Sequence, residues 1–208
     1  VDYSYIKGIT QTSFLPTAQP LIINGNMQVA QRGTSVTAGA TGYHTCDRWK
    51  WAKSYDAVVD FAQETLTSGD AYADGFQKAY KYDVTTADAS MAASHYSTIR
   101  YTWEGQDVQS IKKGTANAQP VTLSFWVKST KTGTFINTLY DGDNNRNCSQ
   151  AYTISSTNTW EKKVVNFPAD TTGVMNSDNA ASLYLNFYTS AGSNYTSGTL
   201  ATTWESYV

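Results

Sequence analysis

The sequence predicts an all-β protein, built as a two-sheet antiparallel β-sandwich with an extended N-terminal arm. Three observations lead to this expectation. Runs of alternating apolar and polar residues recur along the chain, and turn-rich segments separate them. Aromatic residues make up 13% of the 208 residues, with 15 Tyr and 6 Trp among many Thr and Ser, a composition typical of strands. Only one short segment has a helical pattern, and no internal repeat divides the chain.

The N-terminal residues differ from the rest of the chain. Residues 1–20 show no sustained periodicity and include two prolines close to their end. A proline restricts the residue before it and removes a backbone donor, so this segment is expected to be an extended arm or linker outside the core. Residues 21–208 are expected to form one domain.

The first clear strand pattern surrounds two tryptophans. Trp49 and Trp51 lie two residues apart, and Arg48 and Lys50 alternate with them. Because successive side chains of a strand point to opposite faces, the two tryptophans should share one face of this strand and the two cations should share the other. This half-buried pattern is typical of an antiparallel sandwich.

Further strands are expected throughout the domain. The single helical segment, Asp107–Lys113, is closed by Gly114 and is long enough for one or two turns. The stretch Asp141–Arg146 superficially resembles a calcium loop, but Arg146 and Tyr152 occupy the places of the required Gly and Glu, so we expect a hairpin turn. The clearest strand runs are 57–61, 76–84, 98–103, 121–127, 134–140, 149–154, 161–167 and 182–188.

Charge and cysteine usage exclude several classes of protein. The net charge is −2 and charged residues make up only 15% of the chain, so nothing indicates binding to nucleic acid or to an anionic membrane. No apolar run approaches the length of a membrane-spanning helix, so membrane insertion is not expected. Cys46 and Cys148 lie far apart and neither belongs to a metal-type pair. Two free thiols are expected, with a single long-range disulfide as the alternative.

Short blocks follow one another in a characteristic order over residues 21–204. The first blocks are Leu-Ile-Ile-Asn-Gly-Asn-Met at 21–27, Gln-Arg-Gly at 31–33 and Asp-Arg-Trp at 47–49. Later blocks are Glu104–Gln106, Ile111–Gly114, Leu123–Ser129, Thr159–Lys163, Phe167–Gly173 and Gly192–Leu200. In this order they resemble a jelly-roll domain family in the virion proteins of tailed bacteriophages. That family is similar in turn to galactose-binding-like domains and carbohydrate-binding modules.

The resemblance implies a non-enzymatic structural protein of the virion, assembled in the host cytoplasm, in a tail fibre or related appendage. It also implies a homotrimer, contacts with other virion proteins through the N-terminal arm, and a glycan of the host surface as receptor. The alternative is a head-side decoration or fibre protein that stabilises the capsid. A secreted bacterial carbohydrate-binding module is less favoured, because the phage-type blocks match in order. Family members continue past the Thr202–Trp204 block, so we expect the last strands of the domain to be missing.

No catalytic, metal-binding or cofactor pattern is present in the sequence. His44 and His95 lie neither at metal-ligand spacing nor beside a nucleophile motif, so both are expected to be surface or turn residues. No glycine-rich phosphate loop joins a strand to a helix. The acidic residues Asp60, Glu64, Glu104 and Asp107 show no spacing that would pair a general acid with a base. We therefore expect no enzyme, no metal and no cofactor.

Outward-facing aromatic residues are the candidate binding residues. Trp126 should point away from the inward side chains of strand 121–127, and Tyr184, Asn186 and Tyr188 should point away from those of strand 182–188. Tyr140 should likewise point to the opposite side of its strand from Leu139. Aromatic rings beside an amide suit stacking against sugar rings, docking of a neighbouring subunit, or simple exposure. Trp126, Tyr184, Asn186 and Tyr188 come from strands that could neighbour one another on one sheet. Together with Tyr140 they are the candidate glycan platform, and binding there should rely on stacking and hydrogen bonding rather than on charge.

Overall fold

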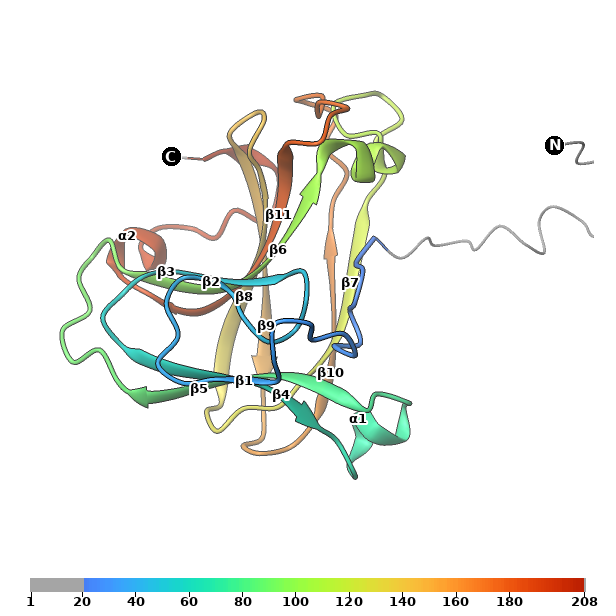
Figure 1. Cartoon of the computed structure of the whole chain (residues 1–208). Helices are drawn as coiled ribbons and strands as arrows, with labels where there is room; N and C mark the ends of the chain where they lie inside the picture. The colour runs from blue at the N-terminus through green and yellow to red at the C-terminus, as the bar shows by residue number, and fades with distance from the viewer. Residues whose placement is uncertain (1–20, 208) are drawn as a thin grey trace, which may run out of the picture.

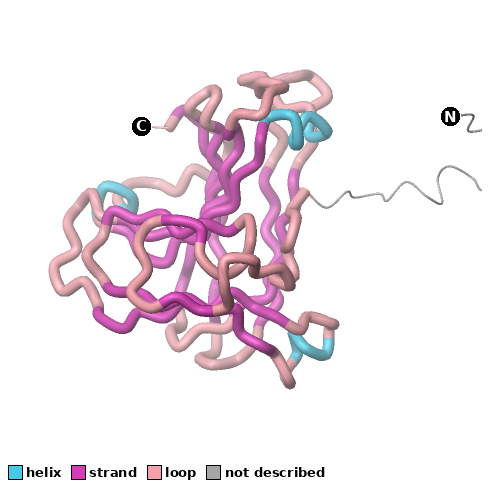
Figure 2. Tube along the Cα trace, viewed as in Figure 1, coloured by secondary structure: helices cyan, strands magenta, loops and turns pink. Residues whose placement is uncertain are grey.

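A computed structural model describes residues 21–207 of the chain, and these residues form an antiparallel β-sandwich (Figures 1 and 2). The predicted N-terminal arm, residues 1–20, lies outside the described residues. Strands dominate the trace, and the helical segments are short and lie between them (Figure 2). The predicted all-β fold class is therefore confirmed.

The largest sheet has seven strands in the order β12-β9-β8-β11-β6-β3-β2, and each paired neighbour is antiparallel. A three-stranded sheet has the order β1-β4-β5, and a two-stranded sheet pairs β10 with β7. The strands of the large sheet are β2 (Gly42–Tyr43), β3 (Trp49–Ser54), β6 (Tyr96–Glu104), β8 (Gly133–Asp141), β9 (Arg146–Ile154), β11 (Ala181–Ala191) and β12 (Glu205–Ser206). The strands of the smaller sheets are β1 (Ser35–Val36), β4 (Val58–Thr65), β5 (Lys78–Thr86), β7 (Val121–Val127) and β10 (Glu161–Phe167).

Both smaller sheets pack against the same side of the seven-stranded sheet. Phe125 of β7 meets Phe187 of β11 with ring centroids 5.1 Å apart, and Trp51 of β3 meets Phe61 of β4 at 5.0 Å. These contacts belong to two apolar clusters, one under each smaller sheet. The opposite side of the seven-stranded sheet is called the outer face below. Burial of the apolar residues on the inner side is the main driving force that holds the layers together.

The predicted alternation of side chains is confirmed on the central strands. Trp49 and Trp51 are 4% and 0% exposed, and Leu183 and Leu185 are each 1% exposed. Leu123 of β7 lies in the same core. Because these residues occur at every second position, the residues between them are placed on the opposite side of their strands.

The predicted helix at Asp107–Lys113 is shifted and is of another type. A 3-10 helix spans Gly105–Ile111, and Lys112 then adopts the left-handed conformation with φ 50°. The chain turns there because the side chain of Lys113 enters a buried ion-pair cluster and Gly114 follows with φ 81°. Within residues 21–207, two further helices were not predicted, α1 (Asp70–Ala73) and α2 (Ser193–Thr196), and each is a single turn.

The predicted hairpin turn at Asp141–Arg146 is confirmed, and Asp141 anchors it. Its Oδ1 accepts the backbone N–H groups of Asp143 and Asn144 at 3.0 and 3.1 Å, and Asn145 adopts φ 51°. Asn is among the residues that tolerate this left-handed conformation in a turn. The turn lets β9 begin at Arg146, earlier than the expected Ser149.

A buried cluster of charges stabilises the end of the sandwich at the turn between β8 and β9. Lys113 is 5% exposed, contacts the fully buried carboxylate of Asp141, and lies 3.0 Å from Asp170 Oδ2. Arg146 Nε donates to the same Asp170 oxygen at 2.9 Å. The Lys113 ammonium also lies 5.0 Å from the ring centroid of Trp204, whose Nε1 donates to the carbonyl of Pro168. The cluster thus joins the residues after the 3-10 helix, the ends of β8 and β9 and the segment after β10.

The two cysteines are both fully buried free thiols, Cys46 in the loop between β2 and β3 and Cys148 on β9. Within residues 21–207, no helix is long and apolar enough to span a membrane.

Candidate functional site

A pair of tyrosines forms the centre of the candidate site on the outer face. Tyr140 of β8 lies directly opposite Tyr184 of β11, with ring centroids 5.7 Å apart. The Tyr140 hydroxyl donates to Asn145 Oδ1 at 3.0 Å, so the hairpin turn fixes its ring. Gly142 in that turn leaves room for Tyr184, because a Cβ atom there would lie 2.9 Å from the Tyr184 ring. Tyr207 extends the pair, with its ring 5.3 Å from that of Tyr140.

Arg100 of β6 lies beside this pair and is held in place by Asn186. The Arg100 guanidinium carbon is 5.3 Å from the centroid of the Tyr184 ring, a cation–π arrangement. Its Nε donates to Asn186 Oδ1 at 2.6 Å, and Asn186 is only 4% exposed. The amide therefore positions the guanidinium and offers little surface of its own.

A second cation lies next to Arg100, on the neighbouring strand β3. Lys50 of β3 lies opposite Arg100 of β6, and Tyr43 of β2 lies opposite Lys50. The Lys50 ammonium is 5.9 Å from the centroid of the Tyr43 ring. In the part of the chain that the structure describes, no carboxylate lies within ion-pair distance of Arg100 or Lys50. Residues Asn186, Arg100, Lys50 and Tyr43, in register across four strands, are called the cationic row below.

A hollow of about 460 Å³ opens at one end of the outer face, next to the cationic row. Thr102 connects the two regions, because it lines the hollow and also lies opposite Tyr184. Arg32 and Arg48 reach the hollow and make loose ion pairs, 3.5 Å to Asp47 and 3.8 Å to Asp107 respectively. The full lining is Gln31, Arg32, Tyr43, Asp47, Arg48, Thr102, Glu104, Asn179 and Ala181.

The predicted platform is wrong in one respect, because Trp126 does not share a sheet with the others. It lies on β7, which pairs only with β10 in the two-stranded sheet and packs through Phe125 onto the inner side of β11. Its side chain therefore faces the opposite surface of the sandwich from Tyr184. Alternation fixes the side of a strand on which a residue lies, but it does not say which sheet contains the strand.

Trp126 is held in place by Asp74 and Lys162, on the surface opposite the outer face. Its Nε1 donates to Asp74 Oδ2 at 3.0 Å, and Lys162 lies 2.9 Å from the same oxygen and 5.7 Å from the Trp126 ring centroid. Hydrogen bonds from Lys162 and Trp126 hold the pKa of Asp74 below its usual value. Trp126 thus joins β7 and β10 to the segment after α1.

Tyr188 is on the predicted outer face and is half-buried beside another tyrosine. Tyr195, next to it, has its ring 6.4 Å from Tyr188 and 5.6 Å from Tyr96. Burial raises the pKa of Tyr188 to about 12. Of the predicted residues, Tyr140, Tyr184 and Tyr188 are therefore all half-buried on the outer face, and only Asn186 is almost fully buried. Tyr188 differs from the other two tyrosines because its ring contacts Tyr195.

Sequence reasoning missed Arg100, Lys50 and Tyr43 as site residues. A signal was present for Arg100, because it lies between Ile99 and Tyr101 in an alternating run. Lys50 was predicted to lie on the opposite face of its strand from Trp49 and Trp51, but its proximity to Arg100 depends on the pairing of β3 with β6. That pairing has no local signature in the sequence.

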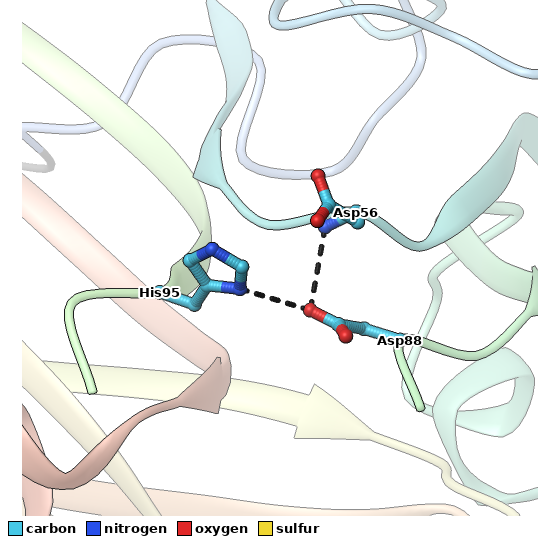
Figure 3. A group of neighbouring side chains, drawn as sticks. All are labelled: Asp56, Asp88 and His95. Atoms are coloured by element: carbon cyan, nitrogen blue, oxygen red, sulfur yellow. Dashed lines mark hydrogen bonds and ion pairs between the residues drawn. The ribbon is translucent and has the colours of Figure 1, made fainter. Parts of the chain in front are cut away.

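Asp56, Asp88 and His95 form a second cluster, whose side chains are of types that can bind a cation (Figure 3). Asp88 Oδ2 accepts from His95 Nδ1 at 3.0 Å and from the backbone N–H of Asp56 at 3.4 Å, and its Oδ1 accepts from the Ser90 N–H at 2.9 Å. Asp56 thus contributes its backbone rather than its carboxylate to these bonds (Figure 3). Hydrogen bonds from Ser90 and His95 lower the pKa of Asp88. The cluster joins the loop before β4 to the loop before β6.

No family model, no curated protein and no solved structure matches this chain.

Proposed function

We propose that this chain is a receptor-binding domain of a tailed-bacteriophage virion, in a tail fibre or a related appendage. Its outer face binds a glycan of the host surface, and its role is binding rather than catalysis. The observation that carries this proposal is the Tyr140–Tyr184 pair with Arg100 beside it. Aromatic faces stack against sugar rings, and a guanidinium supplies hydrogen-bond donors to sugar oxygens.

The position of these residues supports a binding role. Tyr184 lies on β11, which is paired on both sides, by β6 and by β8. A side chain on such a central strand is held in place before the ligand arrives, so less conformational entropy is lost on binding. The ordered blocks that resemble bacteriophage virion proteins support the assignment to a virion, and the all-β sandwich is compatible with it.

Binding is tested with the purified full chain and bacterial surface polysaccharides. Replacing Tyr184 by Ala should weaken binding about tenfold, the equivalent of about 1.4 kcal/mol, because one stacking surface is lost. The matched control is Tyr72→Ala, since Tyr72 is 45% exposed on α1 and lies away from the outer face. Equal binding by Tyr184→Ala, Tyr140→Ala and the unchanged chain would contradict the proposal.

The place of the protein in the virion is tested by gold-labelled antibodies against the domain, observed on intact particles by electron microscopy. Label on the tail fibres supports the proposal. Label on the capsid would favour the alternative of a head-side decoration protein. Absence of label from disrupted as well as intact particles would reject a virion protein of either kind.

The resemblance also supports assembly as a homotrimer, with the N-terminal arm attached to another virion protein. Partly exposed apolar residues such as Val164, which is 58% exposed on β10, provide surface that a neighbouring copy can cover. Sedimentation equilibrium of the full chain should give the mass of a trimer. A strict monomer at micromolar concentration would contradict this part of the proposal.

A further inference from the structure

The centre of the outer face carries two positive charges that neutralise no carboxylate among the described residues. Arg100 and Lys50 lie directly opposite each other in the pairing of β6 with β3. Like charges in this position destabilise a sheet. The other arginines of the described residues, Arg32, Arg48 and Arg146, each have an aspartate partner. The repulsion between Arg100 and Lys50 is therefore an electrostatic cost to the fold that no carboxylate among the described residues offsets.

The hydrogen-bonding geometry leaves Arg100 ready for a ligand. Its Nε is occupied by Asn186, but no hydrogen bond joins its two terminal nitrogens to any described residue. Those nitrogens form one edge of a planar fork whose shape matches the two oxygens of a carboxylate or phosphate. Tyr184 covers one side of the guanidinium, and Arg100 and Lys50 are both partly buried. Reduced contact with water strengthens the attraction of such cations for an anion.

Two carboxylates lie at the margin of this face. Asp47 and Glu104 line the hollow beyond Thr102, and each is already engaged, Asp47 by the backbone N–H of Gln31 at 3.1 Å and Glu104 by Gln106 at 2.8 Å. Neither forms an ion pair with Arg100 or Lys50. An anionic group above the cationic row would therefore meet positive charge.

We infer that the cationic row binds the anionic group of an acidic glycan. This inference rests on the glycan-binding function proposed above and names its substrate class. The Arg100 fork and Lys50 hold the anionic oxygens, and the adjoining sugar ring lies over Tyr184 and Tyr140. The chain as a whole has a small net charge, which led to the expectation that charge contributes little to binding. The local arrangement gives charge a central part instead, because attraction over a few ångströms depends on the nearest groups.

The test uses an array of bacterial polysaccharides that includes uronic-acid polymers, their carboxyl-reduced neutral counterparts and phosphate-bearing polymers. The full chain should bind acidic members at least about tenfold more tightly than their neutral counterparts, and raised salt should reduce that difference. Binding that is lost on carboxyl reduction identifies the anion as a carboxylate, and binding confined to the phosphate-bearing polymers identifies a phosphate. Both results support an anion site.

Two variants test the residues themselves. Arg100→Gln and Lys50→Gln should each weaken binding of the acidic polymer about tenfold or more, while any weak binding of the neutral polymer is retained. The control is Lys131→Gln, an exposed lysine of the β7–β8 loop that also lacks an ion-pair partner among the described residues. Thermal unfolding checks that each variant is folded. If Arg100→Gln unfolds, Lys50→Gln decides the result alone.

The outcomes separate this inference from the function on which it rests. Equal binding of acidic and neutral polymers, with no effect of either variant, would overturn the anion site but leave a glycan-binding domain. Failure to bind any polymer of the array, acidic or neutral, would overturn both.

Discussion

Arg100 and Asn186 are joined across the β6–β11 pairing by a hydrogen bond of 2.6 Å from Nε to Oδ1. The residue that gives the guanidinium its direction is itself almost fully buried, at 4% exposure. The outer face therefore has two levels, with partly exposed groups that can meet a ligand and buried groups that hold them. Loss of a buried partner affects both the fold and the site.

The first prediction concerns this bond. Asn186→Asp keeps the shape of the side chain but places a negative charge beside Arg100. The new ion pair should preserve the thermal stability of the domain and weaken binding of acidic glycans, because the cation is already neutralised. Thermal unfolding and polysaccharide binding measure the two effects. Unchanged affinity in the folded variant would show that the charge of Arg100 is not used.

The second prediction concerns the buried ion-pair cluster. Lys113→Met removes the ammonium that faces the fully buried carboxylate of Asp141. An unpaired buried charge remains, so the free energy of unfolding should fall by about 3–5 kcal/mol in equilibrium urea unfolding. The neighbouring Lys112 is exposed, and Lys112→Met should change stability by less than about 0.5 kcal/mol. Similar values for the two variants would contradict the structural role of Lys113.

The third prediction concerns stability in acid. Burial alone would raise the pKa of Asp170, but hydrogen bonds from Arg146, the Thr172 backbone and Lys113 outweigh it and hold that pKa below its usual value. A carboxyl whose pKa is lower in the folded state stabilises the fold at neutral pH. That contribution is lost as pH falls below about 4, the pKa of an unfolded aspartate, and towards the folded value.

Urea unfolding at a series of pH values from neutral to acid measures this loss. Asp170→Asn should be less stable than the unchanged chain at neutral pH and should lose less stability on acidification. Parallel pH curves for the two proteins would show that Asp170 does not contribute to acid sensitivity.

The fourth prediction separates two effects of a glycine. Gly114 has φ 81°, and a Cβ atom there would lie 2.3 Å from the backbone nitrogen of Val174. Gly75 has φ 96°, but a Cβ atom there would have no neighbour within 4 Å among the described residues. Gly75→Ala should cost about 1 kcal/mol for the backbone conformation alone, and Gly114→Ala clearly more, because the chain after Gly173 must also move. Equal losses in urea unfolding would mean that the close approach is readily relieved.

The fifth prediction concerns the two thiols. Burial raises the pKa of Cys46 and of Cys148 to about 11, so both are protonated at about pH 8 and inaccessible in the folded protein. An aromatic disulfide reagent should therefore react slowly with the native chain and should titrate both thiols after unfolding in guanidinium. Detection of fewer than two thiols in the unfolded, unreduced chain would indicate the long-range disulfide.

Local pattern in the sequence determined most of the strands and the direction of their side chains. The predicted runs 121–127 and 161–167 coincide with β7 and β10, because an alternating apolar run has the period of a half-buried strand. The same alternation placed Tyr184 and Tyr140 on the side of their strands that points away from the core. A local pattern holds no information about distant contacts, which is why the helix was misplaced. The end of the 3-10 helix depends on the burial of Lys113 against residues far along the chain.

The sequence by itself determined that this chain forms an antiparallel sandwich with aromatic side chains on an outer surface, because each strand carries that information in its own residues. Only the tertiary structure decided which strands became neighbours. It separated Trp126 from Tyr184 by placing β7 in another sheet, and it brought Arg100 to Asn186 across 86 residues of sequence. Pairing partners are selected by the packing of whole faces and by hydrogen bonds between distant segments, and both form only in the folded chain.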